Sequence, residues 1–181
     1  PLLIIASYGL ERLSASLKII KIPKVKFLIP VLFLFLVVAP ALHFDYQLLT
    51  NPPPKNLPRA ETIGYFEDWT AGYNFEEIAK FLIEKRKEGP VVVGTEGYFG
   101  TLPDGLLIYL DKENIQVVPG KSTVSAELVK TSEKIPTFYV ANRNRVGREV
   151  EHAKLIKEYL KHKPLDGRQQ DAIVVYQVIP Q

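Results

Sequence analysis

A glycine-rich stretch follows an apolar run, at the kind of place where α/β proteins bind phosphate groups. VVVGTEGYFGTLPDG, residues 91–105, holds Gly94, Gly97, Gly100 and Gly105. A loop that leaves the carboxyl end of a strand and enters a helix exposes backbone N–H groups, which can bind an anion. The same glycines would also suit a tight connection that needs positive φ angles. The sequence leaves both interpretations open, and the second requires no ligand.

The common nucleotide-binding motifs do not fit this stretch. The dinucleotide motif needs G-x-G-x-x-G, whereas the spacing here is G-x-x-G-x-x-G. The next predicted strand, 115–118, has no acidic residue to bind a ribose. The tetrapeptide GKST at 120–123 has the tail of a P-loop, but the first glycine of that motif would fall on Ile115.

The charge of the loop also disfavours a phosphate. Glu96 is negative, and residues 91–111 contain no Lys or Arg to offset it. We therefore predict a chiefly structural loop with weak anion binding. Glu96 is better suited to accept a hydrogen bond from a sugar hydroxyl or a loop N–H. Glu96 and the neighbouring Tyr98 are candidate binding residues.

A second candidate site is the aromatic stretch GYFEDWTAGY, residues 64–73. It places Glu67, Asp68 and Trp69 in succession among other aromatic residues. Carboxylates beside aromatic rings can bind sugars or act as general acid and base, and these three residues are candidate binding residues. A glycosidase pair needs two carboxyl groups at a set separation across a cleft, which adjacent positions do not establish. Alternatively, the aromatic residues seat the domain near a membrane interface.

Other reactive residue types give weaker signals. The sequence has no cysteine, which excludes disulfides and thiolate chemistry. His152 and His162 lie ten positions apart, which is not the i, i+4 spacing of a helical metal pair. The run ANRNRVGR, 141–148, could meet a phosphate or simply be solvated. We assign no catalytic residue, no metal ligand and no cofactor.

Periodicity predicts the elements that must position these residues. Helices and short apolar strands alternate from residue 60 onward, which indicates an α/β domain with a mostly parallel or mixed sheet. Asn74 and Glu77 have the spacing of a capping box at the start of the first helix. The predicted helices are 75–89, 102–114, 124–134 and 148–163, and the predicted strands are 91–94, 115–118, 137–142 and 171–179.

The first 44 residues have the character of a membrane region. Residues 27–44, FLIPVLFLFLVVAPALHF, contain no Asp, Glu, Lys or Arg and are long enough to cross a bilayer core. Residues 1–10 predict the end of another membrane helix, so we expect the chain to be part of a longer protein. Residues 11–26 form a basic loop between the two. A proline-rich linker, 45–59, would join this region to the domain at 60–181.

The distribution of charge predicts an orientation and argues against nucleic acid as a partner. The net charge is +3, from 23 basic and 20 acidic residues. Residues 1–44 hold five of the basic and one of the acidic residues, which leaves 18 basic and 19 acidic residues in the remainder. The remainder therefore lacks the basic surface of a nucleic-acid binder. Short basic loops stay in the cytoplasm, so residues 60–181 should be extracytoplasmic.

These segments, taken in order, resemble the C-terminal part of bacterial membrane glycosyltransferases. The resemblance lies in PLLIIASYGLERL, the basic loop, the last membrane helix, and then GYFEDWTAGYNFEEIAKFL and VVVGTEGYFGTLPDGLLIYL. The family is that of the dolichyl-phosphate-mannose–protein mannosyltransferase-like enzymes, of the GT-C type and related to glycosyltransferase family 39.

The resemblance implies a multi-pass protein of the cell membrane. It implies transfer of a sugar from a polyprenyl-phosphate donor to a glycan or protein acceptor on the outer side, beside membrane lipid. The acidic catalytic residue of the family lies in the first external loop, so no catalytic residue can be assigned within this chain. The alternative is a membrane-tethered α/β module that binds a sugar or phosphorylated ligand without catalysis.

Overall fold

The computed structural model of the chain describes residues 8–9, 11–12, 23–52, 57–147 and 149–181. It divides into two compact units, Pro1–Asn56 and Leu57–Gln181, which are described separately below. Most of the predicted helix end at 1–10 and of the basic loop at 11–26 lies outside the described residues, as does part of the predicted linker, 53–56.

The first unit contains one long helix, α2 (Pro23–Thr50). The helix is longer than the predicted span of 27–44. It begins at a proline, which suits the first helical position because no N–H is needed there. It ends just before Asn51 and Pro52, since the residue before a proline disfavours helical backbone and the proline cannot extend the helix.

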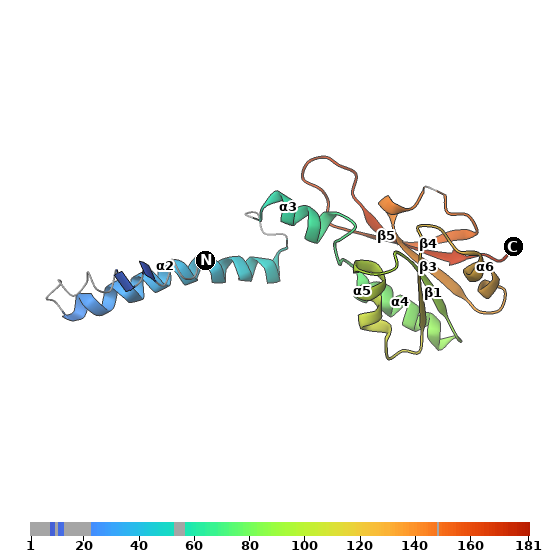
Figure 1. Cartoon of the computed structure of the whole chain (residues 1–181), viewed down its shortest axis with the longest axis horizontal. Helices are drawn as coiled ribbons and strands as arrows, with labels where there is room; N and C mark the ends of the chain where they lie inside the picture. Colours follow the sequence, from blue (N-terminus) through green and yellow to red (C-terminus); the bar gives the residue numbers. More distant parts are fainter. Residues whose placement is uncertain (1–7, 10, 13–22, 53–56, 148) are drawn as a thin grey trace. The chain divides into compact units, whose positions relative to one another are not determined.

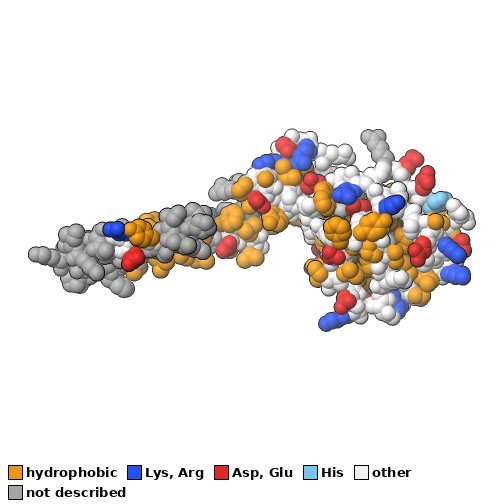
Figure 2. All heavy atoms as spheres, viewed as in Figure 1, with side chains coloured by type: hydrophobic (Ala, Val, Ile, Leu, Met, Phe, Trp, Pro, Cys, Tyr) orange, Lys and Arg blue, Asp and Glu red, His pale blue; other side chains and the backbone are white. Residues whose placement is uncertain are grey.

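Hydrophobic side chains cover the described part of α2 (Figure 2). Its segment Val31–Thr50 has a mean hydropathy of 1.7, and none of it is buried by the rest of the chain. Among the described residues, α2 is the one helix whose length and composition would let it cross a membrane, by those two criteria alone.

The second unit is an α/β domain built on a mixed five-stranded sheet in the order β2-β1-β3-β5-β4 (Figure 1). β1 is parallel to its neighbours β2 and β3, whereas β5 is antiparallel to its neighbours β3 and β4. The strands are β1 (Val92–Glu96), β2 (Gln116–Gly120), β3 (Thr137–Asn142), β4 (Ala153–Leu160) and β5 (Ala172–Val178).

Helices cover both faces of the sheet. The helices α4 (Phe75–Lys87) and α5 (Thr101–Leu110) lie on one face and α6 (Ala126–Ser132) on the other (Figure 1). One core therefore forms between the sheet and the first two helices, around Ile78, Leu82 and Leu106. A second core forms under α6, around Leu128 and Tyr139. Three short turns complete the domain, α3 (Arg59–Thr62), η2 (Ile63–Glu67) and η3 (Arg143–Arg145).

The predicted helix at 148–163 is wrong, because this segment contains strand β4. Its apolar residues are spaced as on a helix because a β-bulge interrupts the two-residue alternation of the strand. The register of β4 against β5 shifts between Leu155 and Lys157. The extra residue at the bulge changes which face the following side chains occupy, and only Tyr159 in this strand is buried. The other predicted helices and strands are confirmed, with shifts of a few residues at their ends.

The predicted capping box at Asn74 is also wrong. Asn74 does precede α4, but it has a φ of 64° and its side chain makes no capping hydrogen bond. Its Nδ2 atom instead donates to the backbone oxygen of Leu160, at 3.0 Å. Asn74 thus ties the start of α4 to the end of β4, a tertiary contact that spacing along the chain cannot reveal.

Candidate functional site

One edge of the sheet collects polar side chains from several segments. β1 and β3 are parallel, so Glu96 and Asn142 end at the same edge. β5 runs the opposite way, and Leu160 pairs with Ala172, so β4 ends and β5 begins there too. Lys161 and Asp171 therefore lie beside the ends of β1 and β3. We call this end of the sheet the carboxyl edge.

A hollow of about 230 Å³ opens at the carboxyl edge, and we call it the aromatic hollow. Three of the five predicted binding residues, Trp69, Glu96 and Tyr98, line it. Tyr98 is 62% exposed and Phe99 86% exposed, so their rings are open to solvent beside it. The remaining lining residues are Gly97, Thr101, Leu102, Pro103, Asn142 and Arg145.

A buried lysine organises the floor of this edge. Lys161 is fully buried, and its Nζ atom donates to Asp171 Oδ2 at 2.9 Å, Asn142 Oδ1 at 2.6 Å and the backbone oxygen of Asp68 at 2.8 Å. Burial lowers the pKa of Lys161, while the hydrogen bond and charge of Asp171 oppose that shift. The three acceptors satisfy the three protons of an ammonium group, so the geometry fits the charged form.

The orientation of the Asn142 amide follows from this lysine. Because Asn142 Oδ1 accepts from Lys161, its Nδ2 points the other way and donates to Glu96 Oε2, at 3.0 Å. The second oxygen of Glu96 lies 2.9 Å from Nε of Arg145. Glu96 is only 4% exposed. Glu96 therefore has two protein partners. Its capacity to accept a hydrogen bond from a sugar hydroxyl, which we predicted from the sequence, is largely used within the protein.

Arg145 is held on two sides. Its Nε bonds Glu96, and its guanidinium carbon lies 4.7 Å from the ring centroid of Trp69, which is a cation–π contact. The side chain nevertheless remains 42% exposed. Arg145 offsets the negative charge of Glu96, which has no Lys or Arg near it within residues 91–111. It comes from η3, about fifty positions further along the chain.

The glycines of the 91–105 stretch have structural tasks. Gly97 and Gly100 have φ angles of 88° and 90°, which other residues rarely adopt. The start of α5 is capped internally, since the backbone N–H of Gly100 donates to Asp104 Oδ2 at 2.8 Å. This carboxylate occupies the position where an anion would bind a helix N-terminus. The geometry therefore supports a structural loop whose ligand contacts, if any, come from side chains.

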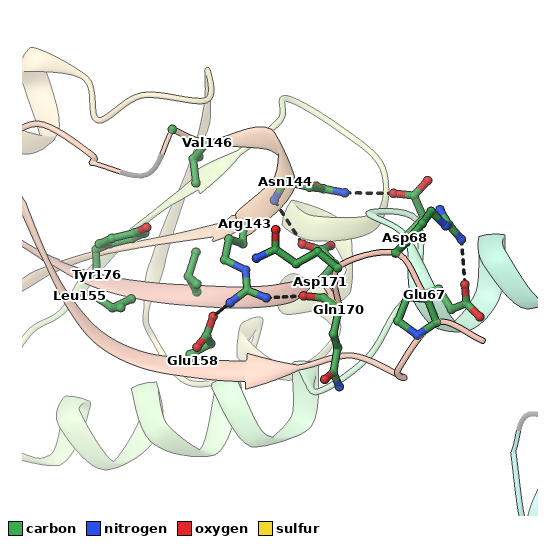
Figure 3. A pocket seen from close by; sticks show the side chains of 15 residues that line it. Glu67, Asp68, Arg143, Asn144, Val146, Leu155, Glu158, Gln170, Asp171 and Tyr176 are labelled. Atoms are coloured by element: carbon green, nitrogen blue, oxygen red, sulfur yellow. Dashed lines mark hydrogen bonds and ion pairs between the residues drawn. The ribbon is translucent and has the colours of Figure 1, made fainter. Parts of the chain in front are cut away.

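A larger hollow, drawn in Figure 3, has a volume of about 500 Å³. Its polar residues are paired with one another. Arg143 bonds Glu158 and the backbone oxygen of Gln170, and Asn144 bonds Asp68 through its side chain and Asp171 through its backbone N–H. The aromatic hollow has the same kind of polar pairing, but it adds the solvent-exposed rings of Tyr98 and Phe99. We therefore take the aromatic hollow as the candidate site.

The remaining two predicted binding residues, Glu67 and Asp68, line the larger hollow. The Glu67 side chain is 1% exposed and accepts from Arg59 at 2.6 and 2.7 Å and from Arg168 at 2.8 Å. The hydrogen bonds from Arg59 hold the pKa of Glu67 below its usual value despite burial. Glu67 thus joins the start of the domain to the segment before β5. Because both of its oxygens are bonded to arginines, Glu67 has a structural role in the fold.

Sequence reasoning missed the residues that build the site around Glu96, namely Asn142, Arg145 and Lys161. A usable signal existed for the first two, because ANRNRVGR directly follows a buried strand whose carboxyl end was predictable. No such signal existed for Lys161, since its segment was predicted to be part of the helix at 148–163. Its burial depends on the strand pairing of β4 with β5.

Comparison with known proteins adds no assignment. No protein-family model matches the chain, and neither the curated proteins nor the solved structures include a significant match.

Proposed function

We propose that the chain is the C-terminal part of an integral-membrane glycosyltransferase. Its α/β domain would lie on the outer side of the membrane and bind a sugar in the aromatic hollow. The wider activity is transfer of a sugar from a polyprenyl-phosphate donor to a glycan or protein acceptor, with membrane lipid around α2. This part of the proposal rests on the sequence resemblance and on the basic flank of α2.

The observation that carries the sugar site is the combination of open rings with fixed polar groups. Trp69, Tyr98 and Phe99 stand at the hollow with exposed fractions of 41, 62 and 86%. Sugar rings present apolar faces that stack on aromatic side chains, while their hydroxyls need donors and acceptors in fixed positions. Glu96 supplies a fixed acceptor, since Asn142 and Arg145 hold its two oxygens and a carboxylate oxygen can accept more than one hydrogen bond.

The runner-up is a membrane-tethered binding module without a transferase parent. It shares the same sugar site, so the hollow supports both functions. The gene upstream of residue 1 separates them. Several further hydrophobic spans, with an acidic residue in the first outer loop, support the transferase, whereas a nearby start codon supports the module.

Sugar binding can be measured on the whole chain in lipid nanodiscs. We expect a panel of neutral methyl glycosides to bind, and W69A and F99A each to weaken that binding. Loss of one stacking ring costs about 1 kcal/mol, or roughly fivefold in Kd.

The matched control is Y109A. Tyr109 is 43% exposed on α5 and does not line the hollow, so this variant should bind normally. Unchanged glycoside binding by both W69A and F99A, with the melting temperature maintained, would remove the sugar site from the proposal.

A further inference from the structure

A chain of hydrogen bonds that ends in an ion pair runs from the interior of the domain to the aromatic hollow. It passes from Asp171 to Lys161, then through Asn142 and Glu96 to Arg145. The first four of these side chains are buried, with exposed fractions of 7, 2, 2 and 4%. Arg145 is the member of this chain that reaches solvent. Its ion pair with the buried Glu96 holds the exposed guanidinium in place.

The guanidinium of Arg145 is fixed in position and in plane. Nε is held by Glu96, and the face is held by the indole of Trp69. Within the described part of the chain, Nη1 and Nη2 make no hydrogen bond or ion pair, and Arg145 lines the hollow. The two terminal nitrogens form a planar fork, which matches the oxygens of a phosphate or carboxylate. An arginine already held in place loses less conformational entropy when it binds.

We propose that Arg145 is an oxyanion anchor, and that the sugar bound in the aromatic hollow carries a phosphate or carboxylate group. The inference rests on the proposed function for the sugar, while the anion contact itself is measured separately below. The fork would take two oxygens of the anion, and the rings of Tyr98 and Phe99 would face the sugar.

The surrounding charges limit the affinity without preventing the contact. Glu96 and Asp171 are each paired with a cation, Arg145 and Lys161 respectively. Asp68 and Asp104 are further carboxylates near this edge. Asp68 Oδ1 accepts from the backbone N–H of Trp69 and from Asn144, and Asp104 Oδ2 accepts from the backbone N–H of Gly100. The paired charges cancel and these two carboxylates leave the edge negative, so the anion contact depends on the orientation of the fork.

The test compares charged and neutral sugars on the whole chain in nanodiscs of zwitterionic lipid. The probes are glucose 1-phosphate, glucuronate, methyl glucoside and inorganic phosphate, titrated by calorimetry at constant ionic strength. We expect the two anionic sugars to bind about tenfold or more tightly than methyl glucoside. Equal affinities for charged and neutral sugars would overturn the anchor and leave the neutral sugar site standing.

The decisive variant is R145K, which keeps the positive charge beside Glu96 and removes the fork. It should reduce binding of glucose 1-phosphate about tenfold and leave methyl glucoside within about twofold. The control is R86K, because Arg86 bonds the backbone oxygen of Asn114 just before β2, at the opposite edge of the sheet. Loss of anion binding in R86K, or normal anion binding in R145K, would overturn the inference.

Two further outcomes separate the proposals and the sources of the anion. Binding of inorganic phosphate that depends on Arg145, without binding of any sugar, supports the anchor and refutes the sugar site. Nanodiscs containing phosphatidic acid test a lipid phosphate. If phosphatidic acid competes with glucose 1-phosphate, and R145K abolishes that competition, the anion is a lipid headgroup. If glucose 1-phosphate binds equally well with and without phosphatidic acid, the anion belongs to the sugar.

Discussion

Lys161 shows how a single side chain can determine the geometry of a site that it does not touch. It is buried with its charge balanced by Asp171 and its remaining donors used by Asn142 and the backbone of Asp68. These three acceptors come from three different segments of the chain. The lysine therefore sets the Asn142 amide and also holds the turn before Trp69 against the carboxyl edge.

We expect K161M to destabilise the domain by about 3–5 kcal/mol, because it leaves the carboxylate of Asp171 buried without its cation. Thermal and urea unfolding of the whole chain measure this effect. K163M is the control, since Lys163 is exposed and should tolerate the change. In the D171L background the further cost of K161M should be much smaller. Equal costs in both backgrounds would show that the pair is not coupled.

At the scale of elements, two glycines allow helices to approach their neighbours closely. A Cβ atom at Gly105 of α5 would lie 2.4 Å from the ring of Phe75 in α4, and one at Gly94 of β1 would lie 2.3 Å from a methyl of Leu128 in α6. The Phe75 ring is itself buried in the first core, so it has little room to move. The glycines of the 91–105 stretch thus serve helix packing as well as loop conformation.

G105A should lower the stability of the domain by about 1–3 kcal/mol, although alanine is otherwise the better residue in a helix. The reason is the clash with the Phe75 ring, which must shift within a packed core. The measurement is the melting temperature of G105A in the parent and in an F75L background. The alanine should cost less in F75L, where the nearest ring atoms are absent. An equal or greater cost there would contradict close packing as the cause.

At the scale of the whole molecule, the proposal depends on the orientation of α2. Five basic residues and one acidic residue precede or lie within the start of this helix, among residues 1–44. Basic residues that flank a span on one side favour the cytoplasmic side. Residues 45–181 carry 18 basic and 19 acidic residues, and the visible face of the domain shows both signs interspersed (Figure 2).

We expect alkaline phosphatase fused after Gln181 to be active, because that enzyme folds only outside the cytoplasm. The same reporter inserted in the predicted basic loop, residues 11–26, should be inactive. A variant with Lys18, Lys21, Lys24 and Lys26 changed to Gln should lose this asymmetry. An inactive C-terminal fusion that is present at normal amounts would refute the orientation and the extracytoplasmic site.

The fold was predictable wherever a local pattern matched the final environment. The run VVVG is apolar because β1 is buried on both faces, and the first helix repeats its apolar residues toward one core. The same reasoning failed at β4. β4 is an outermost strand of the sheet and most of its side chains are exposed. A bulge also shifts the alternation of its side chains between the two faces. Because few of its side chains are buried, the sequence of β4 does not need a two-residue alternation of apolar and polar residues.

The sequence by itself determined the α/β class, the apolar segment that becomes α2, and Trp69, Glu96 and Tyr98 as candidate binding residues in two separate stretches. These features follow from composition and short-range spacing, which the chain carries locally. Only the tertiary structure decided that Arg145 neutralises Glu96, that Lys161 is buried beneath them, and that Glu67 is a structural ion-pair partner. The contacts of Arg145 with Glu96 and of Lys161 with Asn142 join different segments, and they form because the strand order brings the ends of β1, β3 and β4 together.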